Sequence, residues 1–156
     1  MAKAHVRKQL RDAVKARLET VEGLALVADM SRLARELQPH DLPAALVAVA
    51  ETAAVEDRNP EGQRALRRTL QVAVKLVGEA DLDSVEDELD ALAVDVEKAL
   101  AVSDDLGVGT VVGWSYDGAT AVTPEATISG AVLTVTLNYS CAVLTTDVDP
   151  TANLYS

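Results

Sequence analysis

The sequence predicts an α+β domain in which two amphipathic helices pack on one face of a mainly antiparallel β-sheet. Two segments with helical periodicity, near residues 3–20 and 84–102, are separated by segments with the two-residue alternation of strands. The order helix, strands, helix, strands favours helices that lie on one side of the sheet. We expect one domain over residues 1–144 and a C-terminal tail or arm over residues 145–156, because 156 residues suffice for one core.

The first helix is predicted from apolar residues at three- and four-residue spacing. They are Val6, Leu10, Ala13, Val14, Leu18 and Val21. Its other faces carry Lys3, Arg7, Lys8, Arg11, Lys15 and Arg17 against only Asp12 and Glu19. Such a basic surface is either simply solvated or turned toward a partner.

Three strands are predicted after this helix. Residues 23–28 indicate a short strand, and residues 30–37 an irregular or briefly helical connection. Residues 44–49 are continuously apolar, which is typical of a central strand buried on both faces. Residues 56–62 are charged and contain Asn59-Pro60 and Gly62, so they are expected to form a loop.

The third strand is predicted over residues 64–77. One face carries Leu66, Leu70, Val72, Val74 and Leu76, and the other carries Thr69, Gln71, Ala73 and Lys75. Arg68 interrupts the apolar face, so the first half of this strand is expected to project beyond the core.

The second helix is predicted to begin near Asp83, because Glu86 three residues later completes a capping pattern. Its apolar stripe consists of Val85, Leu89, Leu92, Val96, Ala99 and Leu100. Residues 81–105 otherwise hold ten acidic residues and a single basic one, Lys98. On an amphipathic helix these carboxylates are expected to face solvent.

Three further strands complete the predicted sheet. Residues 107–117 are expected to form a strand that turns at Asp117-Gly118, and residues 120–128 a looser extended segment interrupted by Pro124. Residues 131–143 alternate apolar and polar side chains, which predicts a long strand with one buried face. Residues 145–156 look like a mobile tail.

Composition argues against several functions. A net charge of −11 repels phosphate, and 3% aromatic residues leave few rings on which bases could stack, so general nucleic-acid binding is disfavoured. Residues 1–10 lack the apolar run of a signal peptide, and no apolar stretch is long enough to span a membrane. We therefore expect a soluble protein that is not exported.

No residue pattern indicates catalysis or cofactor binding. His5 and His40 belong to different elements, and Cys141 lies in an apolar row, so no metal site and no reactive thiol are expected. Gly107, Gly109 and Gly113 follow a helix and precede a strand, whereas a phosphate-binding loop has the opposite order. We expect no enzymatic activity and no cofactor.

The order of several short motifs resembles the tail terminator family of long-tailed phages, the group that includes the lambda-like minor tail protein U. The resemblance covers roughly residues 4–140. It is carried by the N-terminal helix, Leu42-Pro43-Ala44 before an apolar strand ending at Glu51, the strand 64–77, Asp90-Ala91-Leu92, Val96-Glu97-Lys98-Ala99-Leu100, Gly113-Trp114-Ser115-Tyr116-Asp117, and a strand closing at Asn138-Tyr139. Residues 140–156 run beyond that pattern, either as an arm that grips a neighbour or as a disordered tail.

The resemblance implies a ring, usually of six subunits, on the head-proximal end of the completed tail tube. Such a ring stops tube polymerisation and offers a surface to the head–tail connector or other neck proteins. It belongs to the neck of the virion, is assembled in the host cytoplasm, and lets genomic DNA pass through its lumen without specific binding. The acidity of the chain either keeps DNA from sticking in that lumen or only maintains solubility.

A closed ring needs two different complementary patches on every subunit. The charges predict that the basic first helix and the acidic segment meet between neighbours, through Arg7, Arg11 and Lys15 on one side and Glu86, Asp87 and Asp90 on the other. A second expected contact, with the tube or an adjacent subunit, involves Arg64, Arg67 and Arg68.

Two other interpretations remain open. Another neck component, a head–tail connector or a tail-completion protein, would differ in its position in the particle. A prophage-encoded binding module, monomeric or dimeric, would fail to associate with tail tubes.

Overall fold

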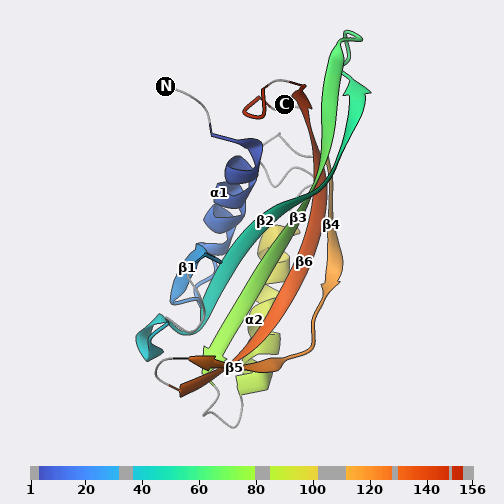
Figure 1. Ribbon diagram of the computed structural model, residues 1–156. Coiled ribbons are helices and arrows are strands. Elements are labelled where there is room, and N and C mark those ends of the chain that lie inside the picture. The colour runs from blue at the N-terminus through green and yellow to red at the C-terminus, as the bar shows by residue number, and fades with distance from the viewer. Residues whose placement is uncertain are drawn as a thin grey trace.

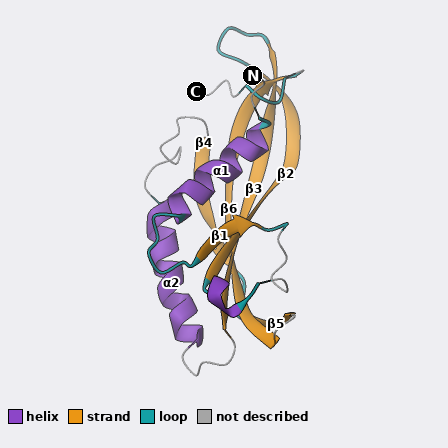
Figure 2. Ribbon diagram, turned by 90° about the vertical axis from the view of Figure 1, so that its left-hand side faces the viewer, coloured by secondary structure: helices purple, strands orange, loops and turns teal. Residues whose placement is uncertain are grey.

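The computed structural model describes residues 4–31, 37–79, 85–101, 112–127, 130–147 and 149–152. It contains helices α1 (Val6–Leu18) and α2 (Val85–Leu100) and strands β1 (Leu26–Asp29), β2 (Ala44–Arg58), β3 (Arg64–Glu79), β4 (Val112–Ala119), β5 (Thr123–Thr127) and β6 (Gly130–Thr146). Both helices lie on one face of the sheet (Figures 1 and 2). The predicted α+β class is therefore confirmed.

The sheet has the strand order β1-β2-β3-β6-β4, and β5 also pairs with β6. Strands β1 and β2 pair in parallel, whereas every other pairing is antiparallel. Strands β2, β3 and β6 form the long centre of the sheet, as predicted for a mainly antiparallel architecture.

The main core lies between the helices and the sheet. Helix α1 contributes the buried side chains of Val6, Leu10, Val14 and Leu18, and α2 contributes Leu89, Leu92, Val96 and Leu100. They meet alternate residues of the strands, including Leu70, Val72, Val74, Leu76, Val135, Leu137 and Tyr139. Most residues of the two helical stripes and of the apolar face of β3 were thus predicted correctly, although Ala13, Leu66 and Ala99 are only partly buried.

A smaller apolar cluster covers the other face of the sheet at one end. It contains Leu37, Ala44, Leu46, Val77 and Val132, next to a short 3₁₀ helix over Pro39–Asp41. The prediction that β2 begins as a strand buried on both faces is confirmed, because residues 44–47 are at most 1% exposed. Farther along β3, this face carries side chains that remain at least partly exposed, namely Lys75, Ala73, Gln71 and Thr69.

Strand β2 is longer than predicted. The charged residues 56–58, expected in a loop, continue its pairing with β3, and the loop is limited to residues 59–63. The start of the chain's first strand was also misplaced, because β1 begins at Leu26 rather than at Gly23.

Two predictions for the second half of the sheet were wrong in detail. Asp117-Gly118 is an irregularity inside β4 and not a turn, with Gly118 at φ +113°. Strand β6 is buried on both faces near its ends, where Val132, Ala142 and Leu144 lie on the face expected to be polar. Some predictions concern residues 32–36, 102–111 and 128, or the capping residue Asp83. These residues lie outside the described part of the chain.

The C-terminal segment contacts the beginning of α1. Strand β6 includes Thr145 and Thr146. Beyond it, the Val6 amide donates to the Pro150 carbonyl at 2.8 Å, and the Gln9 side-chain amide donates to the Thr151 carbonyl at 2.8 Å. The division of the chain into residues 1–144 and 145–156 stays a prediction.

Candidate assembly surface

A projecting hairpin is the most exposed feature of the sheet. We call residues 52–69 the arm; it comprises the end of β2, the loop and the start of β3, and it extends beyond both helices (Figure 1). All of residues 52–58 are exposed. The return strand is supported by β6, which pairs with residues 65–69. The expectation that the first half of β3 projects beyond the core is confirmed.

Hydrogen bonds shape the tip of the arm. The Asn59 side chain accepts from the Gln63 amide at 2.8 Å and donates to the Gln63 side chain at 2.8 Å. The Gly62 amide donates to the Asn59 carbonyl at 2.9 Å, and Gly62 adopts φ +81°, a conformation that favours glycine. The tip is therefore an ordered turn.

A β-bulge marks the root of the arm. Glu51 pairs with Leu70 and Ala53 pairs with Thr69, so Thr52 is an extra residue in β2. The bulge reverses which residues of β2 face the helices. Odd-numbered residues such as Val47 and Glu51 share the helix face before it, whereas Ala54 and Glu56 share that face after it.

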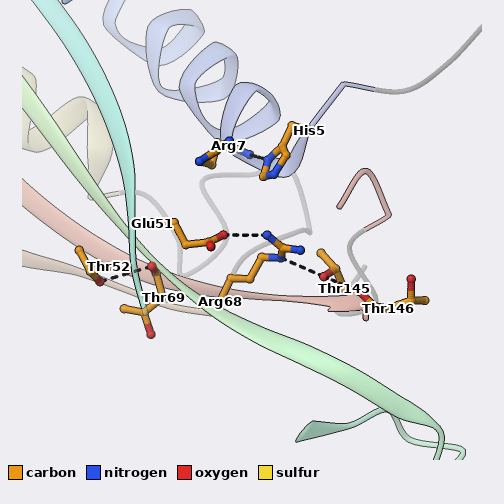
Figure 3. A network of polar contacts seen from close by, with 8 residues as sticks. All are labelled: His5, Arg7, Glu51, Thr52, Arg68, Thr69, Thr145 and Thr146. Atoms are coloured by element: carbon orange, nitrogen blue, oxygen red, sulfur yellow. Dashed lines mark hydrogen bonds and ion pairs between the residues drawn. The ribbon is translucent and has the colours of Figure 1, made fainter. Parts of the chain in front are cut away.

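Arg68 joins three strands just beside this bulge (Figure 3). Its Nη1 donates to Glu51 Oε1 on β2 at 2.8 Å, and its Nε donates to Thr145 Oγ1 on β6 at 3.0 Å. The side chains of Arg68 and Glu51 are only 12% and 24% exposed. Charge-assisted hydrogen bonds of this kind are stronger than neutral ones, so the cluster holds the root together.

His5 lies beside the same cluster and begins α1 (Figure 3). Its Nδ1 accepts from the Arg7 amide at 3.1 Å, which caps the helix. Burial lowers the pKa of His5, as do the nearby guanidinium groups of Arg7 and Arg68, while Glu51 opposes them. A low pKa preserves the cap, because protonated Nδ1 cannot accept a hydrogen bond.

The three arginines expected to contact the tube or a neighbour have different surroundings. Arg68 is engaged within the chain as just described. Arg64 Nε lies 3.6 Å from Glu56 and 3.3 Å from Asp147. Arg67 is exposed and makes no ion pair within the described residues. Of the three, Arg67 is the most available to another molecule.

The residues predicted to form the contact between neighbouring subunits also differ in their ion pairs and exposure. Asp29 Oδ1 lies 3.3 Å from Arg11 Nε and 3.1 Å from Lys15 Nζ, so both cations are already paired within the chain. Arg7 is exposed and has no ion pair in the described segments. The acidic residues of α2 expected at the interface, Glu86, Asp87 and Asp90, are all exposed.

No ion pair joins the basic and acidic sets within the described part of this chain. The contact between neighbours stays a prediction. A substitution of Arg7 tests this contact more directly than a substitution of Arg11 or Lys15, because changing either of those two would also break its ion pair with Asp29.

An aromatic cleft lies where the end of α2 meets β4 and β6. Trp114 stacks on Tyr139 with ring centroids 4.8 Å apart, and Tyr116 tilts against the same ring at 5.3 Å. The Trp114 indole donates to the Leu100 carbonyl at the end of α2, at 2.7 Å. These rings and Glu97 line a cavity of about 320 Å³. The sequence pattern did not predict this cleft, although the cleft contains three of the chain's four aromatic residues.

The described residues contain no group of three or more histidine, cysteine or acidic side chains placed to hold a metal ion. Cys141 is buried, and burial raises the pKa of its thiol to about 12. No helix in the described ranges is both long and apolar enough to cross a membrane.

Comparison with solved structures gives a loose match to a chain of an assembled particle. No protein-family model and no curated protein matches the sequence. A chain of the virion of a native gene transfer agent (GTA) particle matches with 17% sequence identity and a TM-score of 0.44, covering 90% of this chain and 92% of that chain. At this TM-score the likeness supports neither a shared fold nor a function.

Proposed function

We propose that this chain is a tail terminator of a long-tailed phage, a structural subunit without catalytic activity. Copies assemble into a ring, of six subunits as is usual in the family that the sequence resembles. The ring caps the head-proximal end of the tail tube, stops its polymerisation and offers a surface to the head–tail connector. Its place is the neck of the virion.

The projecting arm is the observation that carries this proposal. Residues 52–58 contribute almost nothing to the core, because all of them are exposed. A narrow β-extension gains little stability from its own contacts, and ordering it costs conformational entropy. The arm nevertheless has specific hydrogen bonds at its tip and its root. We therefore expect the arm to contact another molecule, namely a neighbouring subunit or the tube protein.

The charge of the chain is consistent with a passage for DNA. The net charge is −11. Acidic groups facing a lumen repel phosphate, so a genome could slide through without being retained.

The test is the length of tails made without this protein. A nonsense codon early in the gene should give overlong tubes without heads, seen by negative-stain electron microscopy. A plasmid-borne wild-type copy should restore normal tails. Tails of normal length that lack heads would identify a connector instead, and intact particles would contradict a role in the neck.

A further inference from the structure

The arm carries an exposed cation beside an exposed apolar side chain. Arg67 of β3 pairs directly across from Val55 of β2, so both point to the same face of the sheet. Val55 is 55% exposed, and Arg67 is exposed without an ion pair in the described segments. Arginine beside apolar surface is typical of the residues that dominate protein interfaces.

The aromatic cleft carries the complementary groups. Tyr116 is 46% exposed, and Glu97 on α2 lines the cleft without an ion pair among the described residues. The hydroxyl of Tyr139 is buried and has no hydrogen-bond partner in the described structure. Burial, and then Glu97, raise the pKa of both tyrosines, which keeps their hydroxyl groups protonated as donors.

These groups together suit an arginine carried on an extended backbone. A guanidinium stacks on aromatic faces, gaining roughly 0.5–2 kcal/mol from the cation–π interaction, and it pairs with a carboxylate through a planar set of donors.

Arg67 cannot enter the cleft of its own chain. Across the sheet it pairs with Leu144 of β6, whereas Tyr139 pairs with Val72. Leu144 and Tyr139 are five positions apart, which corresponds to about 16 Å along the strand. An odd separation also places them on opposite faces of the sheet. The cation and the cleft can therefore meet only between two copies.

We propose that the Val55–Arg67 pair of one copy docks into the cleft formed by Trp114, Tyr116, Tyr139 and Glu97 of a second copy. Two of the three exposed large hydrophobic residues in the described chain, Val55 and Tyr116, lie at these two sites. The contact joins two different patches and is heterologous, as a ring requires. That this contact repeats around a ring rests on the proposed function.

The contact can be tested by site-specific photo-cross-linking in cells that produce the particle. Val55 is replaced by p-benzoylphenylalanine, which leaves the cleft intact. Irradiation should give a covalent dimer of the chain, with the cross-link mapped by mass spectrometry to residues 97–101 or 114–116 of the second copy. In that background, Arg67→Glu or Glu97→Arg should each reduce the dimer yield at least about tenfold, and the double reversal should restore much of it.

Two matched variants control for general effects of charge. Arg58→Glu changes the same arm on its opposite face, and Asp95→Arg changes the same helix outside the lining of the cleft. Each should alter the yield by less than about twofold. Thermal unfolding of the purified variants checks that every chain folds.

Absence of a dimer, a cross-link outside the cleft, or a double variant as impaired as the single ones would overturn the proposed contact. Overlong tails in the nonsense mutant with no cross-link in the cleft would refute this contact alone. A cross-link in the cleft, together with tails of normal length in the nonsense mutant, would leave the contact standing and refute the terminator role.

Discussion

Replacing Arg68 with alanine should lower the free energy of unfolding by about 2–3 kcal/mol. The change leaves the Glu51 carboxylate without its donor at 2.8 Å and the Thr145 hydroxyl without its donor at 3.0 Å. Breaking a buried ion pair costs about 3–5 kcal/mol, whereas a surface pair contributes about 0–1 kcal/mol. With side chains 12% and 24% exposed, this pair lies nearer the buried limit.

Urea titration and thermal unfolding followed by circular dichroism would measure the effect. For a domain of this size, the loss corresponds to a fall in Tm of about 5–10 °C. Arg67→Ala is the matched control, since Arg67 is exposed on the same strand and its loss should cost less than about 0.5 kcal/mol. The double variant Arg68→Ala/Glu51→Ala should be less destabilised than the sum of the single changes by about 1 kcal/mol or more.

A stabilising role for Arg68 would be refuted if Arg68→Ala lowered the free energy of unfolding no more than Arg67→Ala. It would also fail if the effects of the Arg68 and Glu51 changes simply added, because independent sites show no coupling. Either result would mean that the bridge between the strands does not stabilise the root of the arm.

Three further predictions concern the core and the helix cap. Burial lowers the pKa of His5 in the folded protein. As the pH falls below about 6.5, the unfolded chain therefore binds a proton more readily than the folded chain, and the protein becomes less stable. His5→Asn keeps a capping group and should lose less Tm between about pH 7 and pH 5 than the wild type; equal losses would contradict this. Gly78→Ala should cost about 1–3 kcal/mol in urea titration, because its Cβ would lie 3.0 Å from Val85 and 3.2 Å from Leu89; an unchanged midpoint would count against this close approach of α2 to β3. Cys141, whose pKa burial raises to about 12, should react with a thiol reagent near neutral pH only after unfolding, and rapid labelling of the native protein would disprove that burial.

The elements with a one-sided apolar pattern were predictable from the sequence. The stripes of α1 and α2 and the alternation in β3 correspond to surfaces that are buried in the main core. The end of β2 lacks such a pattern because residues 52–58 are exposed, and its polar residues look like those of a loop. Its strand conformation is imposed by pairing with β3, a partner that local composition does not reveal.

The partner of Arg68 could not be predicted for a related reason. The pairing at the tip, with Arg58 opposite Arg64, would place Glu51 opposite Gln71 if it continued without interruption. Glu51 would then lie on the face away from Arg68. The extra residue Thr52 shifts the register by one and brings the two side chains to one face, and nothing in the local sequence marks that shift.

The aromatic cleft depends on contacts between distant parts of the chain. Trp114 and Tyr139 were both correctly predicted to lie in strands. Their stacking, however, depends on the register of β4 against β6. An irregularity between Val112 and Ser115, where Gly113 adopts φ +70°, alters that register at Trp114. The sequence shows the aromatic residues but does not show that their side chains lie together.

Trp114 is the only tryptophan in the chain, and it stands at the cleft with its indole bonded to the end of α2. The tryptophan fluorescence of the unmodified protein therefore originates at one known place. Excitation at the red edge of the absorption band selects this indole over the tyrosines. A spectral shift on mixing with another protein would report a change at that corner of the molecule without any attached label.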